Sequence, residues 1–331
     1  MTLTKSRLGA SPLHPVFRDW TSAQSFGKLF LDRFIGFWTS ALKYRVLHKT
    51  TYHYTEMVSL CHNEIHLAPR NYTQQTCHYS HLQISPPPSV LTERRDYFGN
   101  TSAFFAIQER HQKLEIAAES KVDVLPSNAP AASMTPAWED VREMLDGKDT
   151  ARHLDASQYI HESHYGKWND DIMAYAKTSF PAGRPILEGA LELTRRIHTD
   201  WIYDSKATNM TTSVAQSFEL RRGVCQDFAH IQIACLRSLG LAARYVSGYL
   251  LTMPPPGRAR LIGADASHAW VSVYCPVFGW IDLDPTNNLI PSDKHVTVAW
   301  GRDYSDVCPV KGVILGGGHH SIHVSVDVAP I

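Results

Sequence analysis

The sequence predicts an α+β protein in which an antiparallel β domain precedes a core with a buried helix packed on an antiparallel sheet. Three observations lead to this prediction. Residues 44–124 alternate between apolar and polar side chains, as strands with one buried face do. Residues 225–239 carry apolar side chains at helical spacing, and residues 268–283 return to strand-like alternation.

Length and charge set broad limits on what the protein does. The chain of 331 residues exceeds one ordinary domain, and a hydrophobic content of 44% suffices for more than one core. The 32 basic and 32 acidic residues cancel, so we expect no field that attracts nucleic acid or an anionic membrane. We predict four parts: an N-terminal extension (1–42), a β-rich domain (43–125), a linker with a helical connector (126–184) and a core (185–331).

The N-terminal extension contains one helix-like segment. Residues 26–42 have an apolar rhythm, but Lys28, Asp32 and Arg33 interrupt it. No run therefore approaches the roughly 18 apolar residues of a membrane span, and the same charges argue against a signal peptide. We expect either a helix docked on the body or a start codon placed too far upstream, with an amphipathic helix at a membrane surface as the lesser alternative, and no integral membrane span.

Strand-like alternation in the β domain covers residues 44–54, 76–84 and 113–124. Residues 94–107 predict a hairpin that turns at Gly99 and Asn100. The histidines of this domain lack a spacing that brings three of them onto one metal site, and we predict no bound metal. They are His53, His62, His66, His78 and His81.

A linker rich in proline, alanine and serine, residues 125–138, separates these strands from a helical region. Helical spacing predicts helices at residues 138–146, 172–180 and 186–201, the last of which follows Pro185. A shorter helix at residues 212–222 then leads the chain to Gly223. We expect the 186–201 helix to pack beside the next buried helix.

Residues 221–240 form the segment around which the core is organised. Gly223 permits a sharp turn, so a helix that begins directly after it holds Cys225 in its first turn, and Gly240 ends this helix. Unpaired amide hydrogens at the start of a helix favour an anion, so a thiol there ionises more readily than one in water. A free cysteine is more often a small core residue, so position alone does not establish a nucleophile.

The segment that follows supplies a histidine and two carboxylates. Alternation predicts one strand that starts near His268 and a second at residues 279–283, joined by a tight turn. Such a hairpin brings Asp284 into reach of His268. Asp282 lies two positions earlier on the same face, and the spacing alone leaves both aspartates open as partners of His268.

Residues 243–251 predict a strand, and the loop after it, residues 252–265, borders the predicted cleft. Arg258 and Arg260 in this loop are candidates for binding an acidic substrate group, although solvated loop charges are the better explanation. The tail, residues 294–307 and 321–331, predicts edge strands that finish the core sheet.

The six cysteines, at positions 61, 77, 225, 235, 275 and 308, include no CxxC pair and no short regular spacing. We therefore expect neither a zinc site nor a dense disulfide framework. The pattern predicts free thiols in a reducing compartment, and hence a cytoplasmic location.

A cysteine, a histidine and a carboxylate are the side chains of a thiol acyl-transfer site. Several blocks resemble the bacterial transglutaminase-like cysteine peptidase family of the transglutaminase and papain-like superfamily: GVCQDFA (223–229), SHAWVSVY (267–274), GWIDLDPTN (279–287), and upstream YRVLHKTTYHY (44–54) and HLAPR (66–70). The resemblance implies a papain-like or transglutaminase-like core behind the family's N-terminal β domain. It makes Cys225 the nucleophile, His268 the general base and acid, and Asp284 rather than Asp282 the orienting acid.

The implied reaction is acyl transfer on an amide bond of a protein or peptide substrate, without a cofactor. We expect hydrolysis, as in a cysteine peptidase, and transfer to an amine or deamidation, as in a transglutaminase, is the alternative. A non-catalytic peptide-binding module is the alternative from another class. Trp270 and, with less support, Gln226 are the predicted substrate contacts, and the Cys225 amide is the predicted oxyanion donor.

Overall fold

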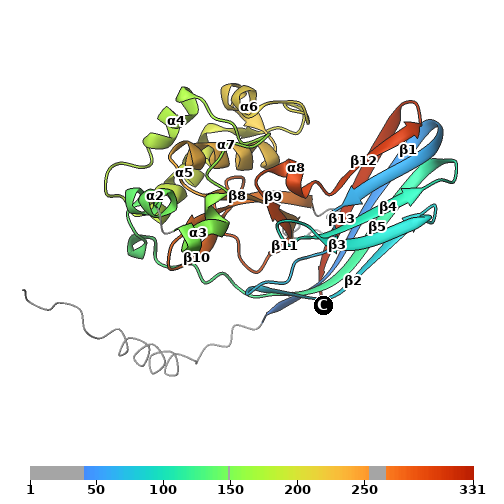
Figure 1. Cartoon of the computed structure of the whole chain (residues 1–331), viewed down its shortest axis with the longest axis horizontal. Coiled ribbons are helices and arrows are strands. Elements are labelled where there is room, and N and C mark those ends of the chain that lie inside the picture. The colour runs from blue at the N-terminus through green and yellow to red at the C-terminus, as the bar shows by residue number, and fades with distance from the viewer. Residues whose placement is uncertain (1–40, 148–149, 253–265) are drawn as a thin grey trace, which may run out of the picture. The chain divides into compact units, whose positions relative to one another are not determined.

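The structure is a computed structural model that describes residues 41–147, 150–252 and 266–331 (Figure 1). The described residues belong to one compact unit. The predicted helix at residues 26–42 falls almost entirely outside them, and so do Arg258 and Arg260. The α+β class predicted from the sequence is confirmed, because an antiparallel β region precedes a core of helices and a second antiparallel sheet.

The first sheet is organised by one long strand, β1 (Leu42–Ile65). Its first half pairs with β5 and its second half with β4, and the order of the sheet is β2-β5-β1-β4-β3. Alternate side chains of β1, such as Tyr44, Val46 and Val58, are fully buried, as period-two alternation requires. The other strands are β2 (Gln75–Ser85), β3 (Val90–Arg95), β4 (Thr101–Ile107) and β5 (His111–Val124).

The C-terminal strands correct one prediction from the sequence. β12 (Val310–Gly316) and β13 (His320–Pro330) pair with β1, not with the core sheet, and Figure 1 shows them beside it. Tyr44 lies opposite Pro330 and Tyr54 opposite His320. Alternation identifies a strand but not its partner, and β1 is long enough to accept a further strand along each half. The range predicted for the core, residues 185–331, therefore includes two strands that belong to the first sheet.

Helices and short connections occupy residues 132–223. Trp138–Asp146 and Ile186–Asp200 match the predicted helices closely, and the latter starts after Pro185, which needs no amide hydrogen there. The predicted 172–180 helix begins two residues earlier, capped by the Asn169 side chain. These elements are η1 (Ala132–Met134), α2 (Trp138–Asp146), α3 (Thr150–Ser157), α4 (Asp170–Lys177), α5 (Ile186–Asp200), β6 (Ile202–Tyr203), α6 (Val214–Leu220) and β7 (Arg222–Gly223).

The core packs α7 (Cys225–Ser238) on an antiparallel sheet of order β10-β9-β8-β11. The strands are β8 (Ala243–Leu250), β9 (Ala266–Cys275), β10 (Gly279–Leu283) and β11 (His295–Gly301), and a short helix, α8 (Tyr304–Val307), follows. Ile231, Ile233 and Leu236 of α7 are fully buried in the same cluster as Val271 and Val273 of β9. Burial of each such side chain contributes about 2 kcal/mol, which fixes the helix on the sheet.

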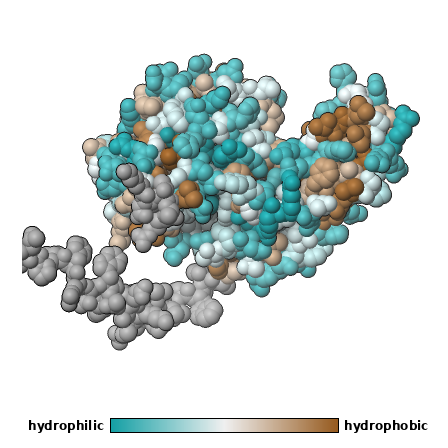
Figure 2. Space-filling model, viewed as in Figure 1, coloured by the Kyte–Doolittle hydropathy of each residue, from teal (hydrophilic) through white to brown (hydrophobic). Residues whose placement is uncertain are grey.

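Figure 2 shows hydrophobic side chains gathered over the β12 end of the first sheet. Val313 and Leu315 of β12 are 75% and 64% exposed, and Met57 of β1 is 47% exposed. Within the ranges the structure describes, no helix combines the length and the apolar character needed to cross a bilayer.

Candidate active site

Cys225 is the first residue of α7, and the turn before it is tightly held. The Asp227 carboxylate accepts hydrogen bonds from the Val224 amide at 2.8 Å and from the Thr208 hydroxyl at 2.6 Å. A side chain at Gly223 would lie 2.5 Å from the same carboxylate, so this position has room only for glycine. The sequence therefore places the Cys225 thiol at the start of a helix, where unpaired amide hydrogens favour negative charge.

His268 and Asp284 come together through the β9–β10 hairpin. Leu283, the last residue of β10, pairs with Val271, so Asp284 emerges beside the start of β9. The His268 Nε2 atom lies 2.7 Å from Asp284 Oδ2. The thiol of Cys225 shares a hydrogen bond with the same imidazole, which leaves Nδ1 as the ring nitrogen for the sulfur. The structure thus brings these three predicted side chains into one chain of hydrogen bonds.

Burial and charge act in opposite directions on His268. Desolvation lowers its pKa, but the hydrogen bonds and charges of Asp284 and Cys225 outweigh burial and raise the pKa to about 10. Burial would raise the pKa of Asp284, yet its hydrogen bonds with His268, His295 and Asn287 hold that pKa well below the ordinary value. At neutral pH the pair is therefore an imidazolium and a carboxylate, which is the arrangement that supports a neighbouring thiolate.

Asp284 is held by more groups than the sequence indicated. Its Oδ1 accepts the amide hydrogens of Thr286 and Asn287 at 3.0 and 3.1 Å, and its Oδ2 accepts the Asn287 side-chain amide at 2.8 Å. A second imidazole, His295, places its Nε2 3.1 Å from the same Oδ2. Asn287 follows Asp284 in an aspartate-proline turn, which is a readable signal. His295 begins β11, and no local pattern connects it to Asp284.

The other sequence candidates occupy different places. Asp282 accepts the indole hydrogen of Trp270 at 3.0 Å, whereas Asp284 is the aspartate hydrogen-bonded to His268. Trp270 is fully buried, and its ring centroid lies 6.0 Å from that of His268. Trp270 therefore packs near the histidine ring on the same strand, β9. Gln226 lies in the first turn of α7 and is partly exposed.

Cys225 also differs from the other thiol on its helix. Cys235 is fully buried and burial raises its pKa to about 12, so it is inert at neutral pH. Cys225 is partly exposed and reaches His268. Partial burial raises the pKa of Tyr203, which is 58% exposed, and the charge of the nearby Cys225 raises it further. Only Cys225 of these two thiols is therefore available to a substrate.

Within the described residues, His268, Asp284 and His295 are a set that could ligate a cation, since their ligand atoms all lie within 4.8 Å of one another. The Nε2 atoms of His268 and His295 lie 2.7 and 3.1 Å from Asp284 Oδ2, which are ordinary hydrogen-bond distances. Ligand atoms of a tetrahedral zinc ion would be roughly 3.3 Å apart. The contacts as they stand are therefore those of a hydrogen-bonded cluster.

Two family models match the chain. The model of the bacterial transglutaminase-like N-terminal region matches residues 44–123, which contain β2, β3 and β4 and most of β1 and β5. The model of the transglutaminase-like superfamily matches residues 172–285, which include Cys225, His268 and Asp284.

The chain is also similar to individual proteins. An uncharacterized protein of Mycobacterium tuberculosis is 41% identical over 297 residues, covering 87% of this chain and 93% of the relative. A protein-glutamine gamma-glutamyltransferase of Pseudomonas aeruginosa is 36% identical over 75 residues, 22% of this chain and 11% of its own length. A solved structure of a candidate cysteine protease from Cytophaga hutchinsonii has the same fold, with a TM-score of 0.69, 22% identity, and coverage of 88% and 92% of the two chains.

Proposed function

This chain belongs to the transglutaminase-like superfamily, and we propose that it is an enzyme that transfers the acyl group of an amide through the thiol of Cys225. The fold and family expected from the sequence are confirmed, whereas the reaction and the roles of the site residues are part of this proposal. The observation that carries the proposal is the chain of hydrogen bonds from Cys225 through His268 to Asp284.

The proposed reaction proceeds in two steps. The Cys225 thiolate attacks the carbonyl carbon of a carboxamide or peptide, and the new C–S bond places the negative charge on oxygen. The His268 imidazolium then donates its proton to the leaving nitrogen as the C–N bond breaks, which leaves a thioester. His268 next takes a proton from the incoming nucleophile as that nucleophile bonds to the carbonyl carbon, and the C–S bond then breaks to restore the thiolate. Asp284 keeps the imidazole ring in its orientation and stays negatively charged in both steps.

Two groups near Cys225 are suited to the oxyanion. The Cys225 amide is at the N-terminus of α7, where it has no partner within the helix. The Tyr203 hydroxyl lies within the electrostatic influence of the sulfur and is exposed, so we propose it as the second donor. Gln226, a substrate contact predicted from the sequence, remains a proposed one from the first turn of the helix. Trp270, the other predicted substrate contact, is instead proposed to support the ring of His268.

We propose water as the nucleophile that resolves the thioester, which makes the reaction hydrolysis of a peptide or amide. Water reaches a partly exposed Cys225, and transfer to an amine requires a site that excludes it. The alternative is amine transfer, as in the Pseudomonas aeruginosa relative named protein-glutamine gamma-glutamyltransferase.

Location in the cytoplasm, predicted from the cysteine pattern, is likewise a proposal, and fractionation of cells that express a tagged chain would test it.

A peptide pool incubated with the protein, with and without a primary amine, distinguishes these reactions by mass spectrometry. We expect cleaved or deamidated peptides in both samples, whereas amine adducts would identify a transglutaminase. Cys225→Ala should abolish every product while the variant stays folded, which a cooperative thermal unfolding transition would establish. Cys77→Ala, which removes another partly exposed thiol, is the matched control and should keep full activity.

Two outcomes would contradict the proposal. Product formation that survives Cys225→Ala would remove the thiol from the mechanism. A folded wild-type protein that yields no product but binds peptides reversibly would favour the non-catalytic peptide-binding module.

A further inference from the structure

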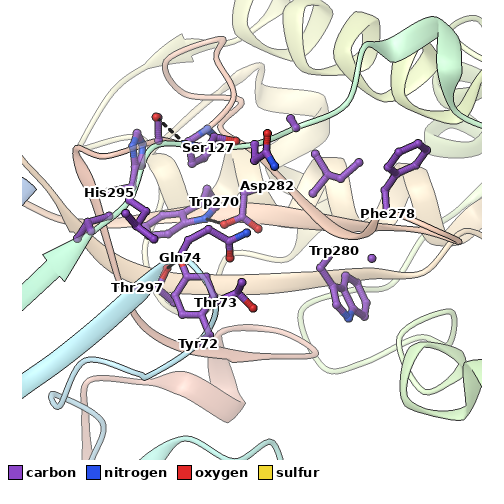
Figure 3. Close-up of a pocket in the computed structure, with 18 of the residues that line it drawn as sticks. Tyr72, Thr73, Gln74, Ser127, Trp270, Phe278, Trp280, Asp282, His295 and Thr297 are labelled. Carbon is purple, nitrogen blue, oxygen red and sulfur yellow. Dashed lines mark hydrogen bonds between the residues drawn. The ribbon is translucent and has the colours of Figure 1, made fainter. Parts of the chain in front are cut away.

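A pocket of about 390 Å³ lies on the face of the core sheet that carries Trp270 and Arg244. Figure 3 shows Tyr72, Trp270, Trp280, Asp282 and His295 arranged around it. Its size is at the lower end of the range for small-molecule sites, and its walls combine aromatic rings with a few polar groups, as such sites do. Cys225 is not among the residues that line it, so this pocket is distinct from the position of the nucleophile.

Arg244 is the residue whose state in this pocket requires explanation. It is 8% exposed and lines the pocket, yet its Nε atom is buried without a hydrogen-bond partner. The described part of the chain offers no acceptor within ion-pair distance of its guanidinium. Burial accordingly lowers its pKa to about 10, and Asp282 opposes this only through a longer-range attraction. A buried cation without hydrogen bonds is costly unless another group completes it.

The surroundings of Arg244 define where such a group binds. The guanidinium carbon lies 3.8 Å from the ring centroid of Trp300 and 4.4 Å from that of Trp280, so aromatic rings already cover the planar group. The N–H groups of a guanidinium point outward in its own plane, in the fork that matches a carboxylate. Because Arg244 lines the pocket, its unpaired N–H groups are suited to a planar anion that binds there.

A second charge of opposite sign lies in the same pocket. Asp282 is half-buried, and one oxygen accepts the Trp270 indole hydrogen at 3.0 Å. In the described residues its other oxygen has no hydrogen-bond donor. Arg244 and Asp282 are both opposite Ser272 in the pairing of neighbouring strands, on either side of β9. The pocket thus presents one cationic and one anionic group, separated by the width of one strand.

We propose that this pocket binds a small amino-acid-like zwitterion, whose carboxylate is held by the Arg244 fork and whose ammonium group faces Asp282. The aromatic rings of Trp280 and Tyr72 then contact its apolar part. A simple anion would satisfy Arg244 but leave Asp282 opposed to it, whereas a zwitterion complements both charges. The proposal does not rest on the proposed function, because neither charged residue belongs to the hydrogen-bonded chain that contains Cys225.

Isothermal titration calorimetry on the full chain tests this site with glycine, L-leucine, L-glutamate and L-phenylalanine as probes. We expect saturable one-to-one binding of at least one of them. The amide of that amino acid, which lacks the carboxylate, and its N-acetyl derivative, which lacks the ammonium group, should each bind roughly tenfold more weakly or worse.

Two substitutions assign the binding to this pocket. Asp282→Asn keeps an oxygen for the Trp270 indole but removes the charge. This variant should therefore bind the amino acid only as weakly as the wild type binds its N-acetyl derivative. Arg244→Gln should abolish binding, and circular dichroism would establish that each variant is folded. No saturable binding of any probe to the folded wild type would overturn the proposal. Affinity that is unchanged in folded Asp282→Asn would do so as well, because the bound molecule would then sit elsewhere.

Discussion

At the scale of single residues, the site depends on how many donors one carboxylate can hold. Asp284 is fully buried, and its Oδ2 atom is hydrogen-bonded to the imidazoles of His268 and His295 and to the side-chain amide of Asn287. A buried carboxylate requires such partners to remain charged. The motif blocks allowed Cys225, His268 and Asp284 to be predicted as site residues because their signals are local. His295 could not be predicted, because the pairing of β11 with β8 brings it to Asp284 and no local pattern encodes that pairing.

Single titratable residues also determine how the stability of the protein depends on pH, and His268 sets the alkaline limit. The folded pKa of His268, about 10, lies above the ordinary value near 6.5. Its stabilising contribution is therefore fully present below about pH 6.5 and is lost as the pH rises toward about 10. Urea unfolding across this range should show a decline in the free energy of unfolding. In Cys225→Ala, which removes one source of the raised pKa, the decline should start at the same pH but be smaller and level off at a lower pH.

At the acidic limit the sign is reversed, because the folded pKa of Asp284 is depressed. Its contribution is present above about pH 4 and is lost as the pH falls further. His295→Ala removes one of the groups that keep this pKa low, so the acid limb of the rate profile should move to higher pH. His295→Gln, which retains a donor, should largely restore it. Coincident acid limbs in wild type and His295→Ala would show that His295 does not position Asp284.

At the scale of elements, the start of α7 is the feature that presents Cys225, the proposed nucleophile. Asp227 is 7% exposed and joins the Val224 amide to the Thr208 hydroxyl, so one side chain fixes the turn from Gly223 into the helix. The sequence predicted this boundary well, because a glycine and a helical apolar rhythm are local signals. Of the two predicted tail strands, β11 does lie at the edge of the core sheet, whereas β13 was assigned to the wrong sheet, since alternation is the same whichever partner a strand meets.

We predict that Asp227→Ala affects both stability and the reactivity of Cys225. Loss of this cap should lower the free energy of unfolding by about 1–2 kcal/mol and slow the alkylation of Cys225 by iodoacetamide, because the thiol loses its fixed position at the helix start. Ser213→Ala is the matched control, since Ser213 caps α6 through the Gln216 amide at 3.2 Å. That variant should lose comparable stability without any change in the alkylation rate. Equal slowing in both variants would reduce the role of Asp227 to general stability.

At the scale of the whole molecule, side-chain amides join the first sheet to the core. β11 is the edge strand of the core sheet, and edge strands leave backbone groups unpaired. Gln75 donates to the Thr297 carbonyl at 2.7 Å and accepts the Thr297 amide at 2.8 Å. Asn100 does the same for Trp300, at 2.9 Å in both directions. Two amides from the first sheet thus act as a partial fifth strand for the core, which no local pattern in the sequence reveals.

This arrangement predicts that Gln75→Leu destabilises the whole protein although it replaces one side chain by another of similar size. Thr297 would keep one partner, because its carbonyl also accepts the Arg70 amide at 3.1 Å, but its own amide hydrogen would be buried without an acceptor. Such a group costs roughly 1–3 kcal/mol, and the Arg70 carbonyl loses its donor as well. Urea unfolding should register this loss, whereas Gln83→Leu, at an exposed position of the same strand, should change stability by less than about 0.5 kcal/mol. If both variants unfold at the same urea concentration as the wild type, the amide of Gln75 contributes nothing to holding the edge of the core, and the apolar contacts between the two sheets must account for their association.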